Sequence, residues 1–335
     1  MHLARFPRVK ICHAPTPLEF LPRLSRVLGG PQIWIKRDDC TGLALGGNKS
    51  RKLEFLVGEA LARGADTLIT PGAVQSNHVR QTAAAARRFG LKAVGVLERR
   101  APVNDDAYRE GGNVLLDRLL GMRFVYRPAG TDMQKALEEE GERFRSEGAK
   151  PYLIPVGGST ATGALGYAAV ALELVTQAND LGLRIDRVVL ASGSAGTQAG
   201  LVAGFETMRA NIGVLGVSVS SARADLEAKA HLLAEATAAR LGLEGGIARE
   251  RVEANDGYVG EGYGIPTAGM AEAVLLLARE EGIFLDPVYS GKAMAGLIDL
   301  IRRGTFRADE NVVFLHTGGQ AGLFAYQEFL SRAAG

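Results

Sequence analysis

Lys49 stands in a setting that could support covalent chemistry. Two glycines and an asparagine precede it, and Ser50 begins a periodic segment that predicts a helix over 50–63. Glycines allow a backbone to approach a ligand closely. A lysine that is desolvated and close to other cations, here Arg51 and Lys52, can have a lowered pKa and form a Schiff base with an aldehyde. The alternative is a surface lysine at the start of a helix.

The same segment almost matches the loop that binds nucleotide triphosphates. Gly42 and Gly47 have the GxxxxG spacing, but Asn48 occupies the position at which that motif requires lysine. We therefore do not expect a triphosphate site here.

A second glycine-rich stretch, SGSAGTQAG at residues 192–200, lies between a segment that predicts a strand and one that predicts a helix. Its backbone N–H groups, small side chains and hydroxyls, at the positive end of a helix, suit an anion. The stretch is not GxGxxG, and no acidic residue ends the next predicted strand, so one phosphate fits better than a dinucleotide. The alternative is a glycine turn without a ligand.

Polar groups also follow the predicted strand 67–70. Ser76 and Asn77 occupy the position of a helix N-cap, so a purely structural role is one interpretation. Their hydroxyl, amide and free N–H groups could instead receive a substrate carboxylate. His78 has no histidine or carboxylate partner at ligand spacing, so we expect it to pack or hydrogen-bond, and we predict no metal site.

Three further polar side chains lie in loops instead of on apolar stripes: Tyr263 in EGYGIP, Tyr289 in DPVYSG and Thr317 in HTGG. Taken singly, each tyrosine could be a buried side chain with a satisfied hydroxyl, and the threonine a helix cap. Taken together with Lys49, Asn77 and the loop 192–200, they suit an aldehyde cofactor that carries one phosphate. Pyridoxal phosphate matches this description.

The elements that must position these groups alternate along the chain. The chain has 335 residues, of which 47% are hydrophobic and 23% charged, enough apolar material for two cores. Apolar strands, periodic helices and short glycine loops predict an α/β fold with open, mostly parallel sheets. The predicted strands cover 33–36, 67–70, 92–97, 123–126, 151–154, 188–191, 214–219 and 312–316. The predicted helices cover 50–63, 77–89, 108–120, 132–147, 164–181, 198–210, 225–241, 268–281, 292–302 and 319–331.

The place of the ligand follows from this fold. Ligands of such sheets bind at the carboxyl ends of the strands. We therefore expect the site in the loops after four strand ends, Thr70, Ile154, Ala191 and His316.

Composition argues against several classes of protein. The net charge of +2 and the lack of a basic and aromatic run do not indicate nucleic acid as a partner. Two cysteines, Cys12 and Cys40, suggest neither a disulfide framework nor a zinc site, and a reducing cytoplasm is the expected setting. No apolar stretch predicts a signal peptide or a membrane span.

Seven segments together resemble the fold-type II pyridoxal-phosphate family that includes 1-aminocyclopropane-1-carboxylate (ACC) deaminase, D-cysteine desulfhydrase and L-cysteate sulfo-lyase. They are GGNKSRKLEF, GAVQSNHVRQTAA, PVGGS, SGSAGTQAGL, EGYGIP, DPVYSGKAMAGL and HTGG. The resemblance implies pyridoxal 5'-phosphate as cofactor, a small amino-acid substrate and a homodimer. It also implies a large cofactor-binding domain of residues 1–49 and 156–335, and a small domain of residues 50–155 that closes over the substrate.

The resemblance also implies roles for individual residues. Catalytic roles fall on Lys49, Ser76, Tyr263 and Tyr289. Cofactor-binding roles fall on Lys49, Lys52, Asn77, Gly193, Ser194, Ala195, Gly196, Thr197 and Thr317. Lys49 resembles the Schiff-base lysine, and Asn77 the residue that bonds the phenolic oxygen. Lys52 and residues 193–197 resemble the phosphate site, Ser76 a carboxylate contact, and Thr317 the group facing the pyridine nitrogen.

Two positions point to the reaction. ACC deaminases usually carry a glutamate and a leucine where this chain has Ser290 and Thr317, and the pattern here is similar to the cysteine and cysteate lyases. A hydroxyl near the pyridine nitrogen leaves the ring a weaker electron sink than a carboxylate does. A weaker sink suffices when a good leaving group departs from the β-carbon.

We therefore predict β-elimination from a sulfur-substituted alanine, with Lys49 as the base that removes the Cα proton. Residues 1–8, 33–42 and 258–267 are similar to cysteate sulfo-lyases, which favours L-cysteate. D-cysteine desulfhydrase is the alternative, and ACC deaminase is less favoured. A protein that binds the cofactor without catalysis would not need Ser76 and the two tyrosines, and a phosphate-binding regulator would not need the lysine.

Overall fold

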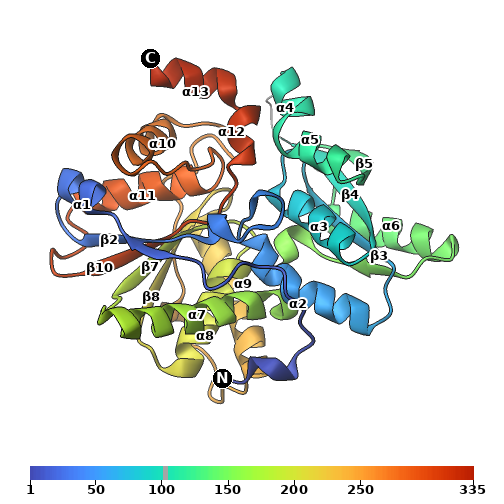
Figure 1. Ribbon diagram of the computed structural model, residues 1–335, viewed down its shortest axis with the longest axis horizontal. Helices are drawn as coiled ribbons and strands as arrows, with labels where there is room; N and C mark the ends of the chain where they lie inside the picture. Colours follow the sequence, from blue (N-terminus) through green and yellow to red (C-terminus); the bar gives the residue numbers. More distant parts are fainter. Residues whose placement is uncertain (101–104) are drawn as a thin grey trace.

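The computed structural model describes residues 1–100 and 105–335, which form two sheets with helices on their faces (Figure 1). The larger sheet has the order β1-β2-β10-β7-β8-β9 and the smaller one β5-β4-β3-β6. Among the described residues all neighbouring strands run parallel except β1 and β2. The predicted α/β fold with open, mostly parallel sheets is confirmed.

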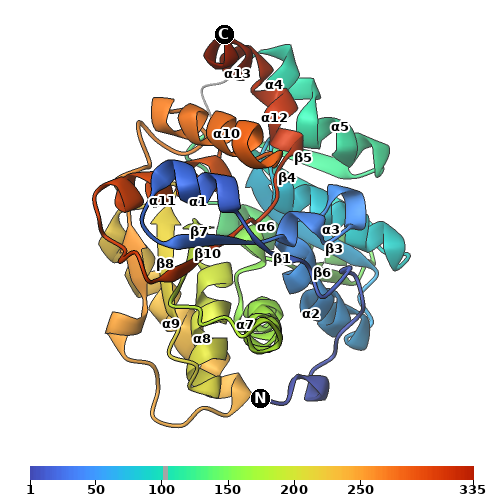
Figure 2. The same cartoon turned by 60° about the vertical axis from the view of Figure 1, so that its left-hand side comes forward.

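The larger sheet consists of β1 (Leu18–Phe20), β2 (Gln32–Lys36), β10 (Asn311–Leu315), β7 (Arg187–Ser192), β8 (Gly213–Ser218) and β9 (Glu253–Asn255). Its helices are α1 (Pro22–Leu28), α7 (Ala161–Leu181), α8 (Gly196–Met208), α9 (Arg223–Leu241), α10 (Ala268–Glu281) and α11 (Ser290–Arg302). Helices α7, α8 and α9 cover one face, and α1, α10 and α11 the other (Figures 1 and 2). A separate apolar cluster fills each face.

The smaller sheet consists of β5 (Arg123–Pro128), β4 (Lys92–Arg99), β3 (Thr67–Ala73) and β6 (Pro151–Leu153). Its helices are α2 (Lys49–Ala62), α3 (Asn77–Arg88), α4 (Asp106–Glu110), α5 (Gly112–Leu119) and α6 (Met133–Ser146). The chain ends with α12 (Ala321–Ala325) and α13 (Gln327–Ala334), and α12 lies against α4 and α5 (Figure 1). Single 3-10 turns are η1 (Leu3–Arg5), η2 (Asp38–Cys40), η3 (Leu43–Leu45), η4 (Val156–Gly158) and η5 (Arg249–Arg251).

Strand β3 is longer than the sequence predicts. The predicted strand ended at Thr70 because a proline follows, but β3 continues to Ala73 alongside β4. On its other side, β6 ends opposite Ile69, so Pro71 lies at an edge of the sheet there, where proline is tolerated. The loop between β3 and α3 is therefore short and consists of Val74, Gln75 and Ser76.

Two predicted helices are each broken in two. The predicted helix 108–120 is α4 and α5, because Gly112 adopts a φ of +55°, which favours glycine. A Cβ at Gly112 would lie 2.6 Å from Oε1 of Gln75, so the break also permits a close approach. The predicted helix 319–331 is α12 and α13, and the short elements β1, α1 and β9 are not among the predicted elements.

A buried set of charges, here termed the ion-pair cluster, joins the start of α2 to the larger sheet and consists of Lys36, Asp38, Arg51 and Glu173. The Arg51 guanidinium donates to Oδ1 of Asp38 at 2.9 Å and to both carboxylate oxygens of Glu173 at 2.7 and 2.9 Å. Nζ of Lys36 donates to Glu173 at 2.5 Å. Buried charges require such partners. Arg51 is therefore committed to the fold, and burial, not the charge of Arg51, lowers the pKa of Lys49.

In the part of the chain that the structure describes, no helix is long and apolar enough to cross a membrane. The predicted domain boundaries, the closing of the small domain and the homodimer stay predictions.

Candidate active site

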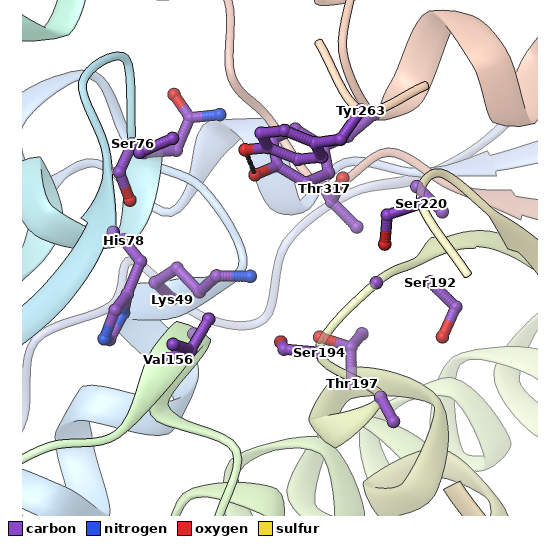
Figure 3. A pocket seen from close by; sticks show the side chains of 18 of the residues that line it. Lys49, Ser76, His78, Val156, Ser192, Ser194, Thr197, Ser220, Tyr263 and Thr317 are labelled. Carbon is purple, nitrogen blue, oxygen red and sulfur yellow. Dashed lines mark hydrogen bonds between the residues drawn. The ribbon is translucent and has the colours of Figure 1, made fainter. Parts of the chain in front are cut away.

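One pocket lies between the carboxyl ends of the two sheets (Figure 3). The loops after β3, β6, β7 and β10 all reach it, as the strand-end rule predicts. Among the predicted site residues, the lining includes Lys49, Ser76, Asn77, Gly193, Ser194, Ala195, Thr197, Tyr263, Tyr289 and Thr317. The two other predicted residues, Lys52 and Gly196, lie directly behind this lining, since a Cβ at Gly196 would be 2.8 Å from Nζ of Lys52.

Lys49 is the first residue of α2, and its ammonium nitrogen points into the middle of the pocket (Figure 3). The backbone before it turns through four residues of positive φ, from Ala44 to Gly47, and Asn48 N–H donates to the carbonyl of Thr317 at 3.0 Å. Burial lowers the pKa of Lys49 to about 8, against the opposing charge of Asp286. A lysine with that pKa is a free amine in about a tenth of molecules at pH 7, far more than an ordinary lysine, and the free amine is the form that a nucleophile or base requires.

Lys52 lies one turn further along α2 and is fully buried. Its Nζ donates to the carbonyl of Gly157 at 3.0 Å and to Oγ of Ser159 at 3.3 Å. Burial, and then the charges of Lys49 and Lys229, lower its pKa well below the usual value. Within residues 1–100 and 105–335 no ion pair joins Lys52 to a carboxylate. A buried cation of this kind calls for an anion from outside the chain.

The loop 192–197 supplies the remaining features of an anion site. Ala195 has a φ of +68° and is the N-cap of α8, and since it lines the pocket, the positive end of that helix lies at the pocket. Oγ of Ser159 donates to Oγ of Ser194 at 2.8 Å and accepts from Gly196 N–H at 3.2 Å. Among the described residues, the buried hydroxyl of Ser192 has no hydrogen-bond partner. Together with Lys52, this loop fits a phosphate monoester such as the one pyridoxal phosphate carries.

The polar residues after β3 fit both interpretations, because they cap a helix and also line the pocket. Ser76 is the N-cap of α3, with Oγ accepting from Val79 N–H at 3.3 Å, yet it also lines the pocket on the same side as Lys49 (Figure 3). His78 pairs its Nε2 with the hydroxyl of Thr70 at 2.8 Å, which confirms the expected hydrogen-bonding role. Burial and the nearby Lys49 hold the pKa of His78 well below its usual value, so its imidazole is neutral. Among the described residues, no three side chains gather as a metal ion would need.

The two predicted tyrosines meet each other. Their hydroxyls hydrogen-bond, and the rings of Tyr263 and Tyr289 pack edge to face with centroids 5.8 Å apart (Figure 3). Burial raises the pKa of Tyr263, and burial followed by the neighbouring Tyr263 raises that of Tyr289. Both hydroxyls therefore stay protonated at neutral pH and can donate hydrogen bonds.

Sequence reasoning missed Arg100 and Lys229, which also line the pocket. The Arg100 guanidinium lies 5.3 Å from the ring centroid of Tyr263, and its Nε donates to Glu98 at 2.7 Å. Arg100 directly follows β4, so the strand-end rule would have indicated it if the predicted strand had not stopped at Leu97. Lys229 comes from the exposed side of α9, and no sequence signal marks it.

The two positions that indicate the reaction in the sequence, Ser290 and Thr317, have different surroundings in the structure. Thr317 lines the pocket, whereas the hydroxyl of Ser290 donates to Oδ1 of Asp286 at 2.6 Å and accepts from its N–H at 2.8 Å. Asp286, which no sequence motif marks as functional, also accepts from the N–H groups of Val288 and Tyr289 at 2.9 Å each. Asp286 and Ser290 thus fix the turn that presents Tyr289.

Comparisons with known proteins find similar sequences and structures along nearly the whole chain. The family model of pyridoxal-phosphate dependent enzymes matches residues 9–318. The D-cysteine desulfhydrases of Salmonella typhi and Salmonella schwarzengrund (strain CVM19633) are each 50% identical over 325 residues, which is 97% of this chain and 98% of each relative. A crystal structure of an ACC deaminase homologue matches with a TM-score of 0.90 at 39% identity, over 99% of this chain and 100% of that one. A hydrogen sulfide-producing enzyme from Fusobacterium nucleatum shares the fold, with a TM-score of 0.64 at 17% identity, over 92% of this chain and 96% of that one.

Proposed function

Because this chain belongs to the family of pyridoxal-phosphate dependent enzymes, we propose that it is a D-cysteine desulfhydrase. It is a carbon–sulfur lyase that uses pyridoxal phosphate, and in the proposed reaction D-cysteine and water give pyruvate, ammonia and hydrogen sulfide. The observation that carries the substrate assignment is the 50% identity to D-cysteine desulfhydrases along 97% of the chain.

This proposal reverses the order of substrates that the sequence favoured. L-cysteate was placed first on three short stretches, whereas the relatives that match along the chain support D-cysteine. The charge around the pocket is also relevant, because a sulfonate would need cationic partners. The guanidinium of Arg100 is already bound by Glu98, so a sulfonate would have to compete with that carboxylate.

Lys49 is proposed as the base. When bound, the cofactor supplies a sink for the electrons that remain on Cα after the proton leaves. The amine of Lys49 takes up this proton, and its lowered pKa, about 8, provides the free base that this step needs.

The substrate carboxylate has a suitable place at the start of α3. The hydroxyl of Ser76 and the free N–H groups of the first turn face the pocket there, and the positive end of the helix favours an anion. A carboxylate held at this point would leave the substrate side chain directed towards the rest of the pocket.

The tyrosine pair is proposed to serve the leaving sulfur. Because both hydroxyls stay protonated, they can donate hydrogen bonds to the sulfur as the bond between Cβ and sulfur breaks and negative charge develops on it. The sulfur then leaves as hydrosulfide, HS⁻, which takes up its second proton from water.

Product analysis tests the proposal. Purified protein that shows the visible absorption of the bound cofactor is given D-cysteine, L-cysteine, L-cysteate and ACC separately, and sulfide, sulfite, pyruvate and 2-oxobutyrate are measured. We expect sulfide and pyruvate in equal amounts from D-cysteine. Sulfite from L-cysteate as the main product would return the assignment to a sulfo-lyase, and 2-oxobutyrate from ACC would make it a deaminase.

A further inference from the structure

Asn113, the second residue of α5, is fully buried behind the pocket and bonds to one of its proposed cofactor ligands. Its side-chain amide nitrogen, Nδ2, donates to Oδ1 of Asn77 at 2.9 Å and to the backbone carbonyl of Gln75 at 3.1 Å. Neither the motifs nor the family resemblance drew attention to Asn113. Nothing in the sequence around Asn113 connects it with Asn77, which lies 36 positions earlier.

These two bonds determine which way the amide of Asn77 faces. A backbone carbonyl can only accept, so the atom of Asn113 beside Gln75 must be its N–H₂ group. That same group also faces Asn77, and the atom of Asn77 beside it must therefore be the carbonyl oxygen. The N–H₂ group of Asn77 is left to face the other way, where a Cβ added at Gly319 would come within 2.8 Å of it. Asn77 itself lines the pocket.

Asn113 is in turn held in place by Gln75. The Asn113 backbone N–H donates to Oε1 of Gln75 at 2.8 Å. Nε2 of Gln75 donates to the carbonyls of Tyr108 at 2.6 Å and Gly111 at 3.0 Å, so the orientation of this second amide is also defined. The loop before α3 and the junction of α4 and α5 are thereby fixed to each other, and the donor direction of Asn113 has no freedom to reverse.

We propose that Asn113 is a positioning residue that keeps the N–H₂ group of Asn77 turned towards the phenolic oxygen of the cofactor. An N–H donor at that oxygen favours its negatively charged form, whereas a carbonyl oxygen in the same place would favour the protonated form. The proposal depends on the proposed role of Asn77 and not on which substrate is cleaved. The charged groups near Asn77 are Lys49 on α2 and Asp286 before α11, and the substitutions below leave both intact.

A double-mutant cycle without substrate tests this role. Asn113→Ala, Asn77→Ala and the double variant are compared by the pH dependence of the visible absorption of the bound cofactor, and by cofactor titration of the apoprotein. Asn113→Ala is expected to raise the pKa of the chromophore by about one unit and to weaken cofactor binding roughly tenfold. In the Asn77→Ala background the same substitution should add nothing, because its effect passes through Asn77.

The matched control is Asp117→Asn, one turn further along α5, which is buried but makes no bond to Asn77 and should leave the absorption unchanged. Equal shifts from Asn113→Ala in both backgrounds, or no shift in either, would overturn the inference. If Asn77→Ala itself leaves the absorption unchanged, the proposed role of Asn77 fails instead. If Asn113→Ala does not fold, Asn113→Leu has a similar volume but neither a donor nor a charge, and it must raise the pKa of the chromophore for the inference to stand.

Discussion

Arg51 and Lys52 are neighbours on the first turn of α2, both are buried, and the protein treats their charges in opposite ways. Arg51 belongs to the ion-pair cluster, where Asp38 and Glu173 neutralise it. Lys52 is bonded to neutral oxygens, and with Lys49 it leaves positive charge beside the pocket. The difference separates two uses of a buried charge, because a compensated charge serves the fold and an uncompensated one awaits a ligand.

The largest expected effect is on activity, from loss of the pocket residue Lys49. Lys49→Ala is expected to lower kcat for sulfide release by at least about a thousandfold, because the base is lost. The free energy of unfolding of the apoprotein should not fall, since Lys49 makes no ion pair among the described residues. The control is Lys229→Ala, which removes another pocket lysine, and a comparable loss in that variant would remove the special role of Lys49.

Loss of Arg51, which belongs to the ion-pair cluster, should lower the stability of the protein. Arg51→Met leaves Asp38 and Glu173 buried without their partner, so the free energy of unfolding should fall by about 3–5 kcal/mol. Denaturant unfolding of the apoprotein measures this change. Arg63→Met, at the other end of α2, breaks only an exposed pair with Glu59 and should cost roughly 0.5 kcal/mol or less. Similar losses in both variants would show that the ion-pair cluster is not special.

A crossed pair of substitutions sharpens the contrast further. Lys52→Met should weaken binding of pyridoxal phosphate to the apoprotein by roughly a hundredfold, equivalent to about 2.7 kcal/mol, and should not destabilise the apoprotein. Lys36→Met, which removes a buried lysine paired with Glu173, should destabilise the protein and leave cofactor affinity nearly unchanged. Cofactor titration and denaturant unfolding are measured for both variants. The comparison would be contradicted if Lys52→Met destabilised the apoprotein and Lys36→Met weakened cofactor binding.

The smallest expected effect is in the pH dependence of apoprotein stability, where both sets of charges should make stability rise with pH but in different pH ranges. Burial opposes ionisation of Asp38, but Arg51 holds the pKa of that carboxyl below its usual value, so this stabilisation is present at neutral pH and lost in acid. The pKa of Lys49 is lowered to about 8, so the unfolded chain binds more protons and stability should rise between about pH 8 and 10.5.

Unfolding of the apoprotein at several pH values, with Lys49→Met as comparison, isolates the alkaline part. The variant should lose some of the rise above pH 8 and keep the fall in acid. An unchanged alkaline rise in Lys49→Met would show that Lys49 is not the group responsible.

Much of the site was predictable because its signals are local. The glycines before Lys49, the small residues of 192–200 and the polar residues after each strand sit next to one another in the chain. In parallel sheets the carboxyl ends of strands lie at one edge, so local signals at several strand ends predict one pocket. The fold class followed from the same alternation.

The remainder depends on partners far apart in the sequence. Arg51 next to Lys49 suggested help with its activation, and only Glu173, 122 residues away, shows that Arg51 belongs elsewhere. The direction of the Ser290 hydroxyl depends on how the turn from Asp286 closes. The position of Asn113 depends on the break between α4 and α5 at Gly112. The helical pattern over 108–120 does not predict this break.

The most direct test of the proposed function is a competition between substrates. The holoprotein is given D-cysteine and L-cysteate together at equal concentration, and initial rates of sulfide and sulfite release are measured, with Lys49→Ala as control. We predict that sulfide predominates by at least about a hundredfold, equivalent to about 2.7 kcal/mol in transition-state binding, and that it disappears in the variant. A predominance of sulfite would contradict the assignment of D-cysteine as substrate.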